Sequence, residues 1–330
     1  MKAAWYEARG AARDVLHVGM VARPGPGQGE VLVRVRASAV NPSDVKSRSG
    51  RGTRANAYPR VIPHQDGAGV IVAVGAGVDG ARVNERVWIY EAQLGRPYGC
   101  AAEYVAVPAI NAVHLPDHVS FEEGACLGIP ALTAHYCVMA DGPVAGQRVL
   151  VTGGGGSVSH YALQFARLGG ATTYATVRTE EQAEAAHAAG AQHLLFRLKE
   201  DVAQRIAEIS GVPDGRAIDR VVDVAFGANL ETSLKVLKSN GVIASYASDQ
   251  VPVPAVPFWQ LAALNATVHH VLVYAMDRAA HDRAIAAVTT ALAQRQLRHR
   301  IAARYALDQI VQAHEAQESG ATVGKIIVTP

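Results

Sequence analysis

Four consecutive glycines, Gly153, Gly154, Gly155 and Gly156, follow the strand-like segment RVLVT and precede apolar residues at helical spacing. Glycine allows a tight turn after a strand and lets the backbone come close to a ligand. The N-terminus of the helix that follows offers unpaired N–H groups and the positive end of a dipole. We therefore predict a site that binds the phosphates of a dinucleotide.

Serines stand at two positions where a dinucleotide-binding fingerprint favours glycine. Ser157 adds bulk and a hydroxyl donor beside the phosphates, and Val158 follows it in the same predicted site. Ser159 stands where helix and strand should pack closely. Two interpretations remain open: a slightly altered phosphate site, or a glycine-rich turn that holds no ligand. In the first, changing both serines to glycine keeps or improves cofactor affinity, whereas a clear loss would make the hydroxyls ligands.

The end of the next predicted strand, TTYATV, indicates which dinucleotide binds. An acidic residue there would bind the ribose hydroxyls of NAD, but the chain has Arg178, with Thr176 and Thr179 beside it. A guanidinium binds a phosphate bidentately, so Arg178 and Thr179 favour NADPH over NADH. Glu180 and Glu181 are expected to be acids of a first helical turn. The alternative is a solvated arginine at a strand end.

The elements around this stretch differ along the chain. The first 120 residues or so contain short strands, such as 30–40 and 67–75, separated by Gly, Pro and Asn turns, which is typical of a small irregular β-barrel. Strand-like and helix-like segments then alternate, which predicts a doubly wound α/β unit with a mainly parallel sheet. A strand is expected over TVHHVLVY, residues 267–274. Near the end of the chain we expect a helix with Asp308 as its N-cap.

Composition narrows the class of protein. The 330 residues suffice for two domains, and 49% hydrophobic against 18% charged residues indicates a folded chain. The net charge of +2 gives no reason to expect a nucleic-acid partner. No apolar run is long enough to span a membrane, and MKAAWYEARG does not resemble a secretion signal. Three cysteines without a C-x-x-C pair fit a reducing cytoplasm and argue against a cysteine-built zinc site.

Several segments resemble one family in content and order. They are SAVNPSDVKSRSG (38–50), DGAGVIVAVG (66–75), AAEYVAVP (101–108), LPDHVSFEEGACLGIPALTAHY (115–136) and SGATVGKIIV (319–328), which flank the glycine stretch. Nearly end to end, the chain resembles the NADPH:quinone oxidoreductases. These are the zeta-crystallin-like, zinc-free branch of the medium-chain dehydrogenase/reductase superfamily. LGIPALTA and the closing SG-x-x-x-GK are the specific motifs.

The resemblance implies an architecture with two domains. A GroES-like, β-rich catalytic domain would comprise residues 1–120 and 276–330, and a Rossmann NADPH-binding domain, residues 121–275, would be inserted between them. The cofactor would lie in the cleft. Members usually form homodimers by joining sheet edges, and TVHHVLVY is the expected edge strand.

The resemblance also assigns catalytic residues. Asn41 and Asp44 would lie in the active-site wall near the nicotinamide, although turn residues often satisfy only their own backbone. Many members have a tyrosine where this chain has Lys46. A lysine in the cleft could donate a proton or hydrogen bond to a carbonyl oxygen. It could equally pair with Asp44 or point to solvent.

Further cofactor-binding residues follow from the same resemblance. Thr133, in the GIPALTA turn, would lie near the cofactor, or it could be a helix cap. The backbone around Val271, Leu272 and Val273 would contact the nicotinamide amide. Lys325 would lie by the cofactor cleft, or it could be a solvated lysine at a strand end.

The positions of zinc ligands can be compared with alcohol dehydrogenase relatives. Those relatives have a cysteine where Asn41 stands and a histidine–glutamate pair where Gln65 and Asp66 stand. Neither Asn nor Gln is a good zinc ligand, so we predict no metal. His64 is one position out of register and is expected to be a structural or surface histidine.

The main functional hypothesis is hydride transfer from NADPH to a quinone or quinone-like acceptor without a metal, in the cytoplasm. The first alternative is an NADPH-dependent enoyl or alkenal reductase that acts on an α,β-unsaturated carbonyl compound. The second is a crystallin-like protein that binds NADPH or RNA without useful turnover. The third is a zinc alcohol dehydrogenase, which would require stoichiometric zinc.

Overall fold

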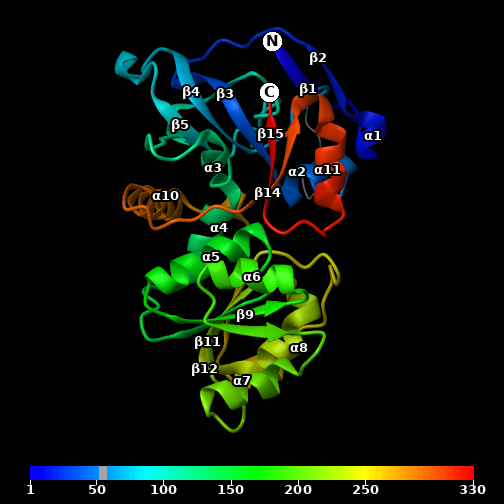
Figure 1. The fold of residues 1–330 in the computed structure, drawn as a ribbon, viewed down its shortest axis with the longest axis vertical. Helices are drawn as coiled ribbons and strands as arrows, with labels where there is room; N and C mark the ends of the chain where they lie inside the picture. The colour runs from blue at the N-terminus through cyan, green and yellow to red at the C-terminus, as the bar shows by residue number, and fades with distance from the viewer. Residues whose placement is uncertain (52–57) are drawn as a thin grey trace. The chain divides into compact units, whose positions relative to one another are not determined.

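The computed structural model describes residues 1–51 and 58–330 (Figure 1). The chain folds as two compact units, Met1–Ile129 with Val288–Pro330, and Pro130–Ala287. The divisions fall inside helix α4 (Gly128–Met139) and helix α10 (Arg278–Ala293). The sequence places the domain boundaries after residues 120 and 275.

The first unit is built around a seven-stranded sheet and a two-stranded sheet. The large sheet has the order β14-β15-β3-β4-β5-β7, with β6 also pairing β3, and the small sheet is β1-β2. Its strands are β1 (Lys2–Trp5), β2 (His17–Met20), β3 (Glu30–Val40), β4 (Asp66–Val74), β5 (Arg86–Ile89), β6 (Tyr104–Pro108), β7 (Ala112–His114), β14 (Ile301–Ala306) and β15 (Lys325–Thr329). Its helices are α1 (Ala12–Val15), α2 (Pro42–Ser49), α3 (Phe121–Ala125) and α11 (Ile310–Glu318).

Strand β3 organises this unit because it pairs with β4, β6 and β15, all antiparallel. Val31, Val33 and Val35 are buried, whereas Arg34 and Arg36 on the opposite side are exposed. This period-2 alternation is typical of a strand with one face on the core. The β-rich first domain predicted from the sequence is confirmed.

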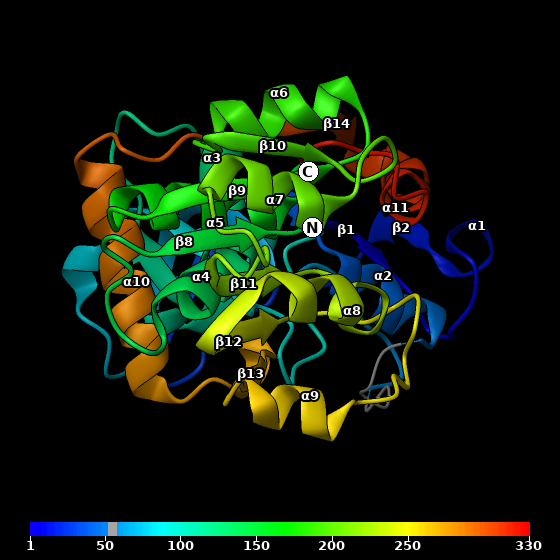
Figure 2. The same cartoon turned by 90° about the horizontal axis from the view of Figure 1, so that it is seen from below.

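The second unit contains a six-stranded parallel sheet of order β10-β9-β8-β11-β12-β13 (Figure 2). Its strands are β8 (Arg148–Val151), β9 (Thr172–Val177), β10 (His193–Phe196), β11 (Ile218–Asp223), β12 (Leu237–Ser245) and β13 (Thr267–His270). Its helices are α5 (Ser157–Leu168), α6 (Glu180–Ala188), α7 (Val202–Ser210), α8 (Phe226–Val236) and α9 (Phe258–Ala263). Figure 1 shows α5 and α6 on one face of the sheet and α7 and α8 on the other.

The strand order reverses between β8 and β11, at the centre of this sheet. In doubly wound sheets, ligands bind outside the carboxyl ends of the strands at such a reversal. The predicted Rossmann fold is confirmed, and the glycine run follows β8, one of the two strands at the reversal.

Two local predictions were wrong. The strand expected over residues 267–274 ends at His270 because its partner β12 ends at Ser245, the residue paired with His270, and a 3₁₀ turn, Val273–Ala275, follows. Asp308 is not the N-cap of α11. It lies within a 3₁₀ turn, Leu307–Gln309, and forms an ion pair with Lys2 at 2.6 Å.

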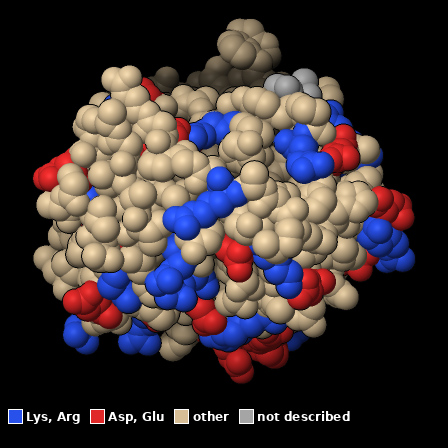
Figure 3. Space-filling view, turned by 90° about the horizontal axis from the view of Figure 1, so that it is seen from above, with Lys and Arg blue, Asp and Glu red and all other residues tan. Residues whose placement is uncertain are grey.

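Three further observations concern the helices, the surface and the cysteines. Among the described residues, none of the helices combines the length and apolar composition that a membrane span requires. Basic and acidic side chains intermingle on the face seen in Figure 3. Cys100, Cys126 and Cys137 are buried and form no disulfide.

Candidate functional site

The glycine turn is tightly constrained by its neighbours. Gly153 has a φ of +66°, in the left-handed region that favours glycine. Its N–H donates to Thr176 Oγ1 at 3.0 Å, and the N–H of Gly154 donates to the Thr176 carbonyl at 2.8 Å. A Cβ on Gly154 would lie 2.9 Å from the Cβ of Ala186 in α6. The turn is therefore hydrogen-bonded to β9 and packs closely against α6.

The turn leaves donors for a ligand where it enters α5. Gly156 is the N-cap of this helix, and its N–H donates a hydrogen bond to the Gly153 carbonyl at 3.0 Å. In the described part of the chain, no acceptor takes the backbone N–H groups of Gly155 and Val158. Unpaired N–H groups at a helix N-terminus favour an anion. The arrangement fits the predicted phosphate site.

The two serines have different surroundings. Ser157 is the first residue of α5 and is half-buried. Ser159 is fully buried, and its hydroxyl donates to the Thr152 carbonyl at 3.0 Å and contacts Tyr246 Oη at 3.2 Å. The hydroxyl of Ser159 therefore joins α5 to the end of β8 inside the fold. Its replacement by glycine removes an interior hydrogen bond, a cost that the sequence did not reveal.

Arg178 and Thr179 follow β9 directly. Arg178 is exposed, and its backbone N–H donates to Gln182 Oε1 at 2.9 Å. Thr179 is the N-cap of α6, and its Oγ1 accepts from the N–H of Gln182 at 3.3 Å. Thr179 thus stabilises the start of the helix, while the guanidinium of Arg178 stands at the carboxyl end of the sheet.

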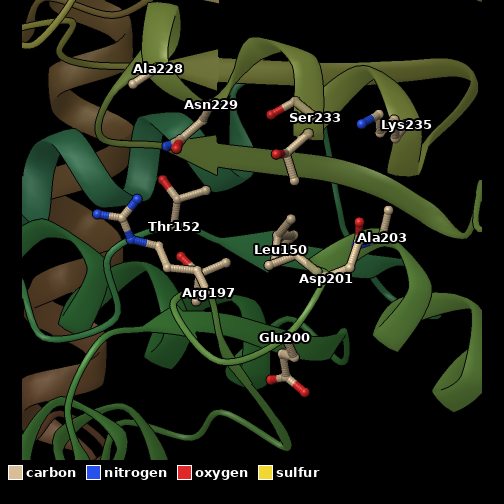
Figure 4. A pocket seen from close by; sticks show the side chains of 13 residues that line it. Leu150, Thr152, Arg197, Glu200, Asp201, Ala203, Ala228, Asn229, Ser233 and Lys235 are labelled. Atoms are coloured by element: carbon tan, nitrogen blue, oxygen red, sulfur yellow. The ribbon is translucent and has the colours of Figure 1, made fainter.

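A pocket of about 260 Å³ opens at the carboxyl ends of β8, β9 and β10, between α7 and α8 (Figure 4). Its polar lining includes Thr152, Thr176, Arg197 and Asn229. Thr152 Oγ1 donates to Asp223 Oδ1 at 2.8 Å, and Asn229 Nδ2 donates to the same oxygen at 2.7 Å. Asp223 thereby orients two residues of the pocket.

Sequence reasoning missed these pocket residues. Thr152 and Arg197 each stand directly after a parallel strand, as Arg178 does. The rule that ligands meet strand carboxyl ends would have found both. Asn229 lies inside α8, and no sequence signal marked it.

The first unit contains a buried polar cluster, defined here as Asn41, Asp44, Asp66 and Lys325. Because β15 pairs antiparallel with β3, with Ile326 opposite Val40, Lys325 lies beside Asn41. The ammonium of Lys325 donates to Asn41 Oδ1 and lies 3.6 Å from Asp66 Oδ2. Asn41 Nδ2 donates to Asp66 Oδ2 at 2.8 Å. The amide of Asn41 therefore links the cation to the carboxylate.

Asp44, the remaining member of the cluster, accepts two hydrogen bonds from the backbone. The N–H groups of Asn41 and Gln65 donate to its two carboxylate oxygens at 2.7 and 3.2 Å. All four members of the cluster are less than 5% exposed. A Cβ on Gly128 would lie 2.0 Å from Asp66 Oδ1, so α4 approaches this carboxylate closely because its first residue is glycine.

Two carboxyl groups share this cluster with one ammonium. Burial, together with the charge of Asp66, raises the pKa of Asp44 to about 7. The hydrogen bond from Asn41, the charge of Lys325 and the hydrogen bond from Gln65 oppose the rise. Burial also raises the pKa of Asp66, against the charge of Lys325. Near neutral pH the pair of carboxyl groups therefore holds a proton on a fraction of molecules.

His64 has a structural role beside the cluster. Its φ of +79° is unusual for a residue with a side chain. Its Nδ1 lies 2.7 Å from Ser38 Oγ, and its Nε2 lies 3.0 Å from His314 Nε2. Arg48 donates to His314 Nδ1, so the proton of His314 is on Nε2, and His64 carries its proton on Nδ1. Burial lowers the pKa of His64 to about 3, in keeping with this neutral pair.

The remaining predicted residues have varied surroundings. Lys46 is half-buried on α2, two residues after Asp44. Thr133 is buried in the interior of α4; the expected turn or cap was wrong because GIPALTA is helical. The N–H of Val271 donates to the Ser245 carbonyl at 2.7 Å, which continues the register of β12 by one residue. Leu272 is 49% exposed and Val273 is buried.

The side chains at the positions of zinc ligands are engaged within the protein. The Asn41 amide contacts Lys325 and Asp66, and the Gln65 amide exchanges two hydrogen bonds with Gln93 at 3.2 and 3.1 Å. Within residues 1–51 and 58–330, no three His, Cys, Asp or Glu side chains are grouped so that they could hold a metal ion.

This chain combines a β-rich unit with a doubly wound unit that carries a glycine turn. That combination is typical of two-domain dehydrogenases and reductases. Two family models match the chain: "Alcohol dehydrogenase GroES-like domain" over residues 27–117 and "Zinc-binding dehydrogenase" over residues 189–328. Quinone oxidoreductase from Pseudomonas aeruginosa is 30% identical over 92% of each chain. Quinone oxidoreductase from Lama guanicoe is 29% identical over 93% of this chain and 91% of that relative.

Solved structures agree along the whole length. A mycobacterial protein complexed with NADPH matches with a TM-score of 0.87 at 28% identity, covering 100% of both chains. Escherichia coli quinone oxidoreductase complexed with NADPH matches with a TM-score of 0.87 at 25% identity and the same coverage. A 2-haloacrylate reductase matches with a TM-score of 0.83 at 26% identity, covering 100% of this chain and 99% of its own. The chain belongs to the quinone oxidoreductase family of medium-chain dehydrogenases/reductases, as its motifs predicted.

Proposed function

We propose that this chain transfers a hydride from NADPH to a quinone or quinone-like acceptor. The observation that carries the proposal is the glycine turn after β8, at the reversal of the strand order, with the unpaired N–H groups of Gly155 and Val158. Membership of the quinone oxidoreductase family and the two solved neighbours complexed with NADPH support it.

The residues of the second unit fit a dinucleotide. The glycine turn and the first turn of α5 would hold the pyrophosphate, and the pocket beside Thr152 and Asn229 would take the adenosine half. Arg178 stands where an NAD-dependent protein would have an acid. When bound, NADPH supplies the hydride, and the protein aligns and desolvates the reactants.

Asp44 would serve as the proton reserve of the site. A quinone that accepts a hydride also needs a proton on oxygen, and a carboxyl group with a pKa of about 7 can hold one at neutral pH. Asn41 would act as a positioning residue, because its amide fixes both Lys325 and Asp66. Lys46 and Thr133, and the backbone of residues 271–273, remain proposed site residues on the family resemblance.

Reduction of an activated alkene is the second candidate. The 2-haloacrylate reductase among the solved neighbours favours it, since such a substrate is an alkene conjugated to a carboxylate. Both reactions need the same hydride donor, so only the acceptor distinguishes them. Rates of NADPH oxidation with simple quinones, set against rates with α,β-unsaturated carbonyl compounds, decide between the two.

We propose that the reaction uses no bound metal. The amide groups of Asn41 and Gln65 are poor zinc ligands and make hydrogen bonds within the protein. Elemental analysis after desalting tests this directly. Zinc below a tenth of an equivalent is expected, and one equivalent of zinc per chain contradicts the proposal.

We also propose a homodimer formed through β13 in a reducing compartment. Among the described strands, β13 is the last of its sheet and pairs with β12 alone, so its outer backbone edge can pair with a second copy. Three buried, unbridged cysteines fit a reducing compartment such as the cytoplasm. Light scattering coupled to size-exclusion chromatography should give twice the chain mass, and a concentration-independent monomer contradicts the dimer.

The decisive experiment for the proposed function is turnover. Purified protein is mixed with NADPH and 1,4-benzoquinone, and the nicotinamide absorbance is followed. Oxidation that depends on both the protein and the quinone is expected. Binding of NADPH without turnover of any quinone or enone contradicts the proposal and favours a binding protein.

A further inference from the structure

Two buried histidines lie side by side in the first unit, between α11 and the segment that leads into β4. The rings of His64 and His314 are nearly parallel, with an interplanar angle of 18° and centroids 5.2 Å apart. His314 comes from α11, which packs beside α2 (Figure 1). His64 precedes Gln65, which is followed by the first residue of β4. Both histidines are fully buried, so their ring nitrogens depend on partners inside the protein.

A directed chain of hydrogen bonds runs through the two rings. With the tautomers given above, Nε2–H of His314 donates to Nε2 of His64 at 3.0 Å. Nδ1–H of His64 donates to Ser38 Oγ at 2.7 Å, and this hydroxyl donates to the carbonyl of Asp66 at 3.4 Å. Removing one member therefore leaves a buried polar atom without its partner.

The chain holds a backbone conformation that a side chain disfavours. The φ of +79° at His64 lies in the left-handed region, where a Cβ is crowded. Such a conformation persists only when its surroundings fix it. The two hydrogen bonds of the ring do so, together with the His64 carbonyl, which accepts from the N–H of Cys100 at 2.9 Å. A return to a negative φ would rotate the peptide between residues 64 and 65 and the N–H that it carries.

That N–H, which belongs to Gln65, donates to Asp44 Oδ1 at 3.2 Å. A hydrogen bond to a carboxylate favours its charged form. The charges of Asp66 on β4 and Lys325 on β15 also act on Asp44, and Tyr6, after β1, lies within reach of its charge. Burial lowers the pKa of both histidines, so they are neutral. They can therefore act on Asp44 through position and not through charge.

We propose that His314 and His64 are positioning residues, which hold the Gln65 N–H on Asp44 and so set the pH range over which Asp44 keeps its proton. The inference rests on the proposed function, in which Asp44 supplies a proton to the acceptor. When the chain is broken, the peptide before Gln65 turns away and the carboxylate of Asp44 loses one of its donors. Asp44 then keeps its proton to a higher pH.

The test uses His314→Leu, with His314→Gln as the conservative variant and Val107→Ala as the control. Leucine cannot donate to His64, whereas the amide of glutamine can donate from the position of Nε2. Val107 is fully buried on β6 and pairs with Val31, at the opposite end of β3 from Asn41. Its truncation opens a cavity and destabilises the unit without removing a hydrogen bond.

The titration of Asp44 is followed by NMR on protein labelled with ¹³C at the carboxyl groups of aspartate. The Asp44 signal is assigned by its loss in Asp44→Asn. His314→Leu should raise the midpoint of this titration by about one pH unit, as expected for the loss of one hydrogen bond to a carboxylate. His314→Gln and Val107→Ala should keep the wild-type midpoint. Turnover of a quinone should persist to a correspondingly higher pH in His314→Leu alone.

Two further measurements apply if His314→Leu does not fold. Ser38→Ala removes the acceptor of the His64 ring and should shift the Asp44 midpoint in the same direction. In the wild type, ¹⁵N spectra of the imidazoles, assigned by comparison with His314→Gln, should show both rings neutral across about pH 5 to 9. The proton should lie on Nδ1 of His64 and on Nε2 of His314.

Three outcomes overturn the proposal. One is an Asp44 midpoint that His314→Leu and Ser38→Ala leave unchanged. Another is an equal shift in His314→Gln or Val107→Ala, which would mean that the hydrogen bond between the histidines does not matter. The third is a wild type in which either histidine is charged or has its proton on the other nitrogen. A wild type that turns over no quinone or enone contradicts the proposed function instead, and the titration of Asp44 still tests the chain.

Discussion

In the first unit, Lys325, Asp44 and Asp66 are buried and connected through Asn41, whereas in the second unit Arg178 and Arg197 are exposed and lack acidic partners among the described residues. Buried charges persist only when they are paired and hydrogen-bonded, and their protonation shifts in response. Exposed cations at a strand edge keep their charge and stay available to a ligand. The first site is suited to holding a proton, and the second to selecting an anion.

The largest expected effect is on kcat, when the carboxyl group proposed to supply a proton to the acceptor is removed. Asp44→Asn should lower kcat by about 10²- to 10⁴-fold, since it removes the proposed proton reserve and keeps the side-chain shape. The NADPH dissociation constant should change little. Rates with a quinone acceptor across pH 5 to 9 measure this, with Asp117→Asn, at a 96% exposed side chain, as control. A kcat that stays within 2-fold of the wild type would remove Asp44 from the chemistry.

The next effect concerns the cation that balances the cluster. Lys325→Met should destabilise the fold by about 3–5 kcal/mol, because it leaves two buried carboxyl groups without their ammonium. Lys235→Met is the control, because Lys235 is exposed and pairs with Glu231 at 2.8 Å on the surface of α8. Its cost should stay below about 1 kcal/mol. Urea unfolding at pH 7 measures both, and equal losses would mean that burial of the cluster contributes nothing.

The cluster also predicts a pH dependence of stability. The pKa of Asp44 is about 7 in the folded protein against 3.8 as the ordinary value, so the folded state binds more protons between these values. The contribution of Asp44 is fully present below pH 3.8 and is lost as the pH rises through about 7. The free energy of unfolding should therefore fall less steeply with rising pH in Asp44→Asn. Identical slopes in urea titrations of the two proteins would contradict the raised pKa.

The smallest effect separates the two serines of the glycine stretch. Ser159→Ala should lower the free energy of unfolding by about 1 kcal/mol, because it removes the bond to the Thr152 carbonyl. Ser157→Ala should cost less, because Ser157 is half-buried at the first position of α5, whereas Ser159 is fully buried. Thermal unfolding measures both. If Ser157 is the more costly of the two, the hydroxyl of Ser159 does not fasten α5 to β8.

Much of the second site could be predicted because its residues are neighbours in sequence. One strand–helix–strand unit contains the glycine turn, Ser157, Arg178 and Thr179, so the local sequence pattern and the rule that ligands meet strand carboxyl ends both apply to it. Arg197 was missed, although the same rule covers it, because the end of β10 carries no glycine signal.

The first site could be predicted only in part. Asn41 and Asp44 came from the family resemblance, but their connection to Lys325 depends on a contact across 284 residues. No local sequence pattern predicts that β15 pairs with β3. A lysine at the start of a strand is usually exposed, so the burial of Lys325 could not be predicted either. The hydrogen bonding of Ser159 could not be predicted for the same reason. Its partner Tyr246 follows β12, which lies two strands away from β8 in the sheet.

Binding of NADPH by the second unit, with selection by its phosphate, underlies both the proposed function and the comparison of the two sites. The most direct measurement is a fluorescence titration of the desalted protein with NADPH and then with NADH. We expect saturable NADPH binding at least about 10-fold tighter than NADH binding, because charge-assisted contacts to the phosphate are made with NADPH alone. Binding of neither cofactor, or equal binding of both, would contradict it.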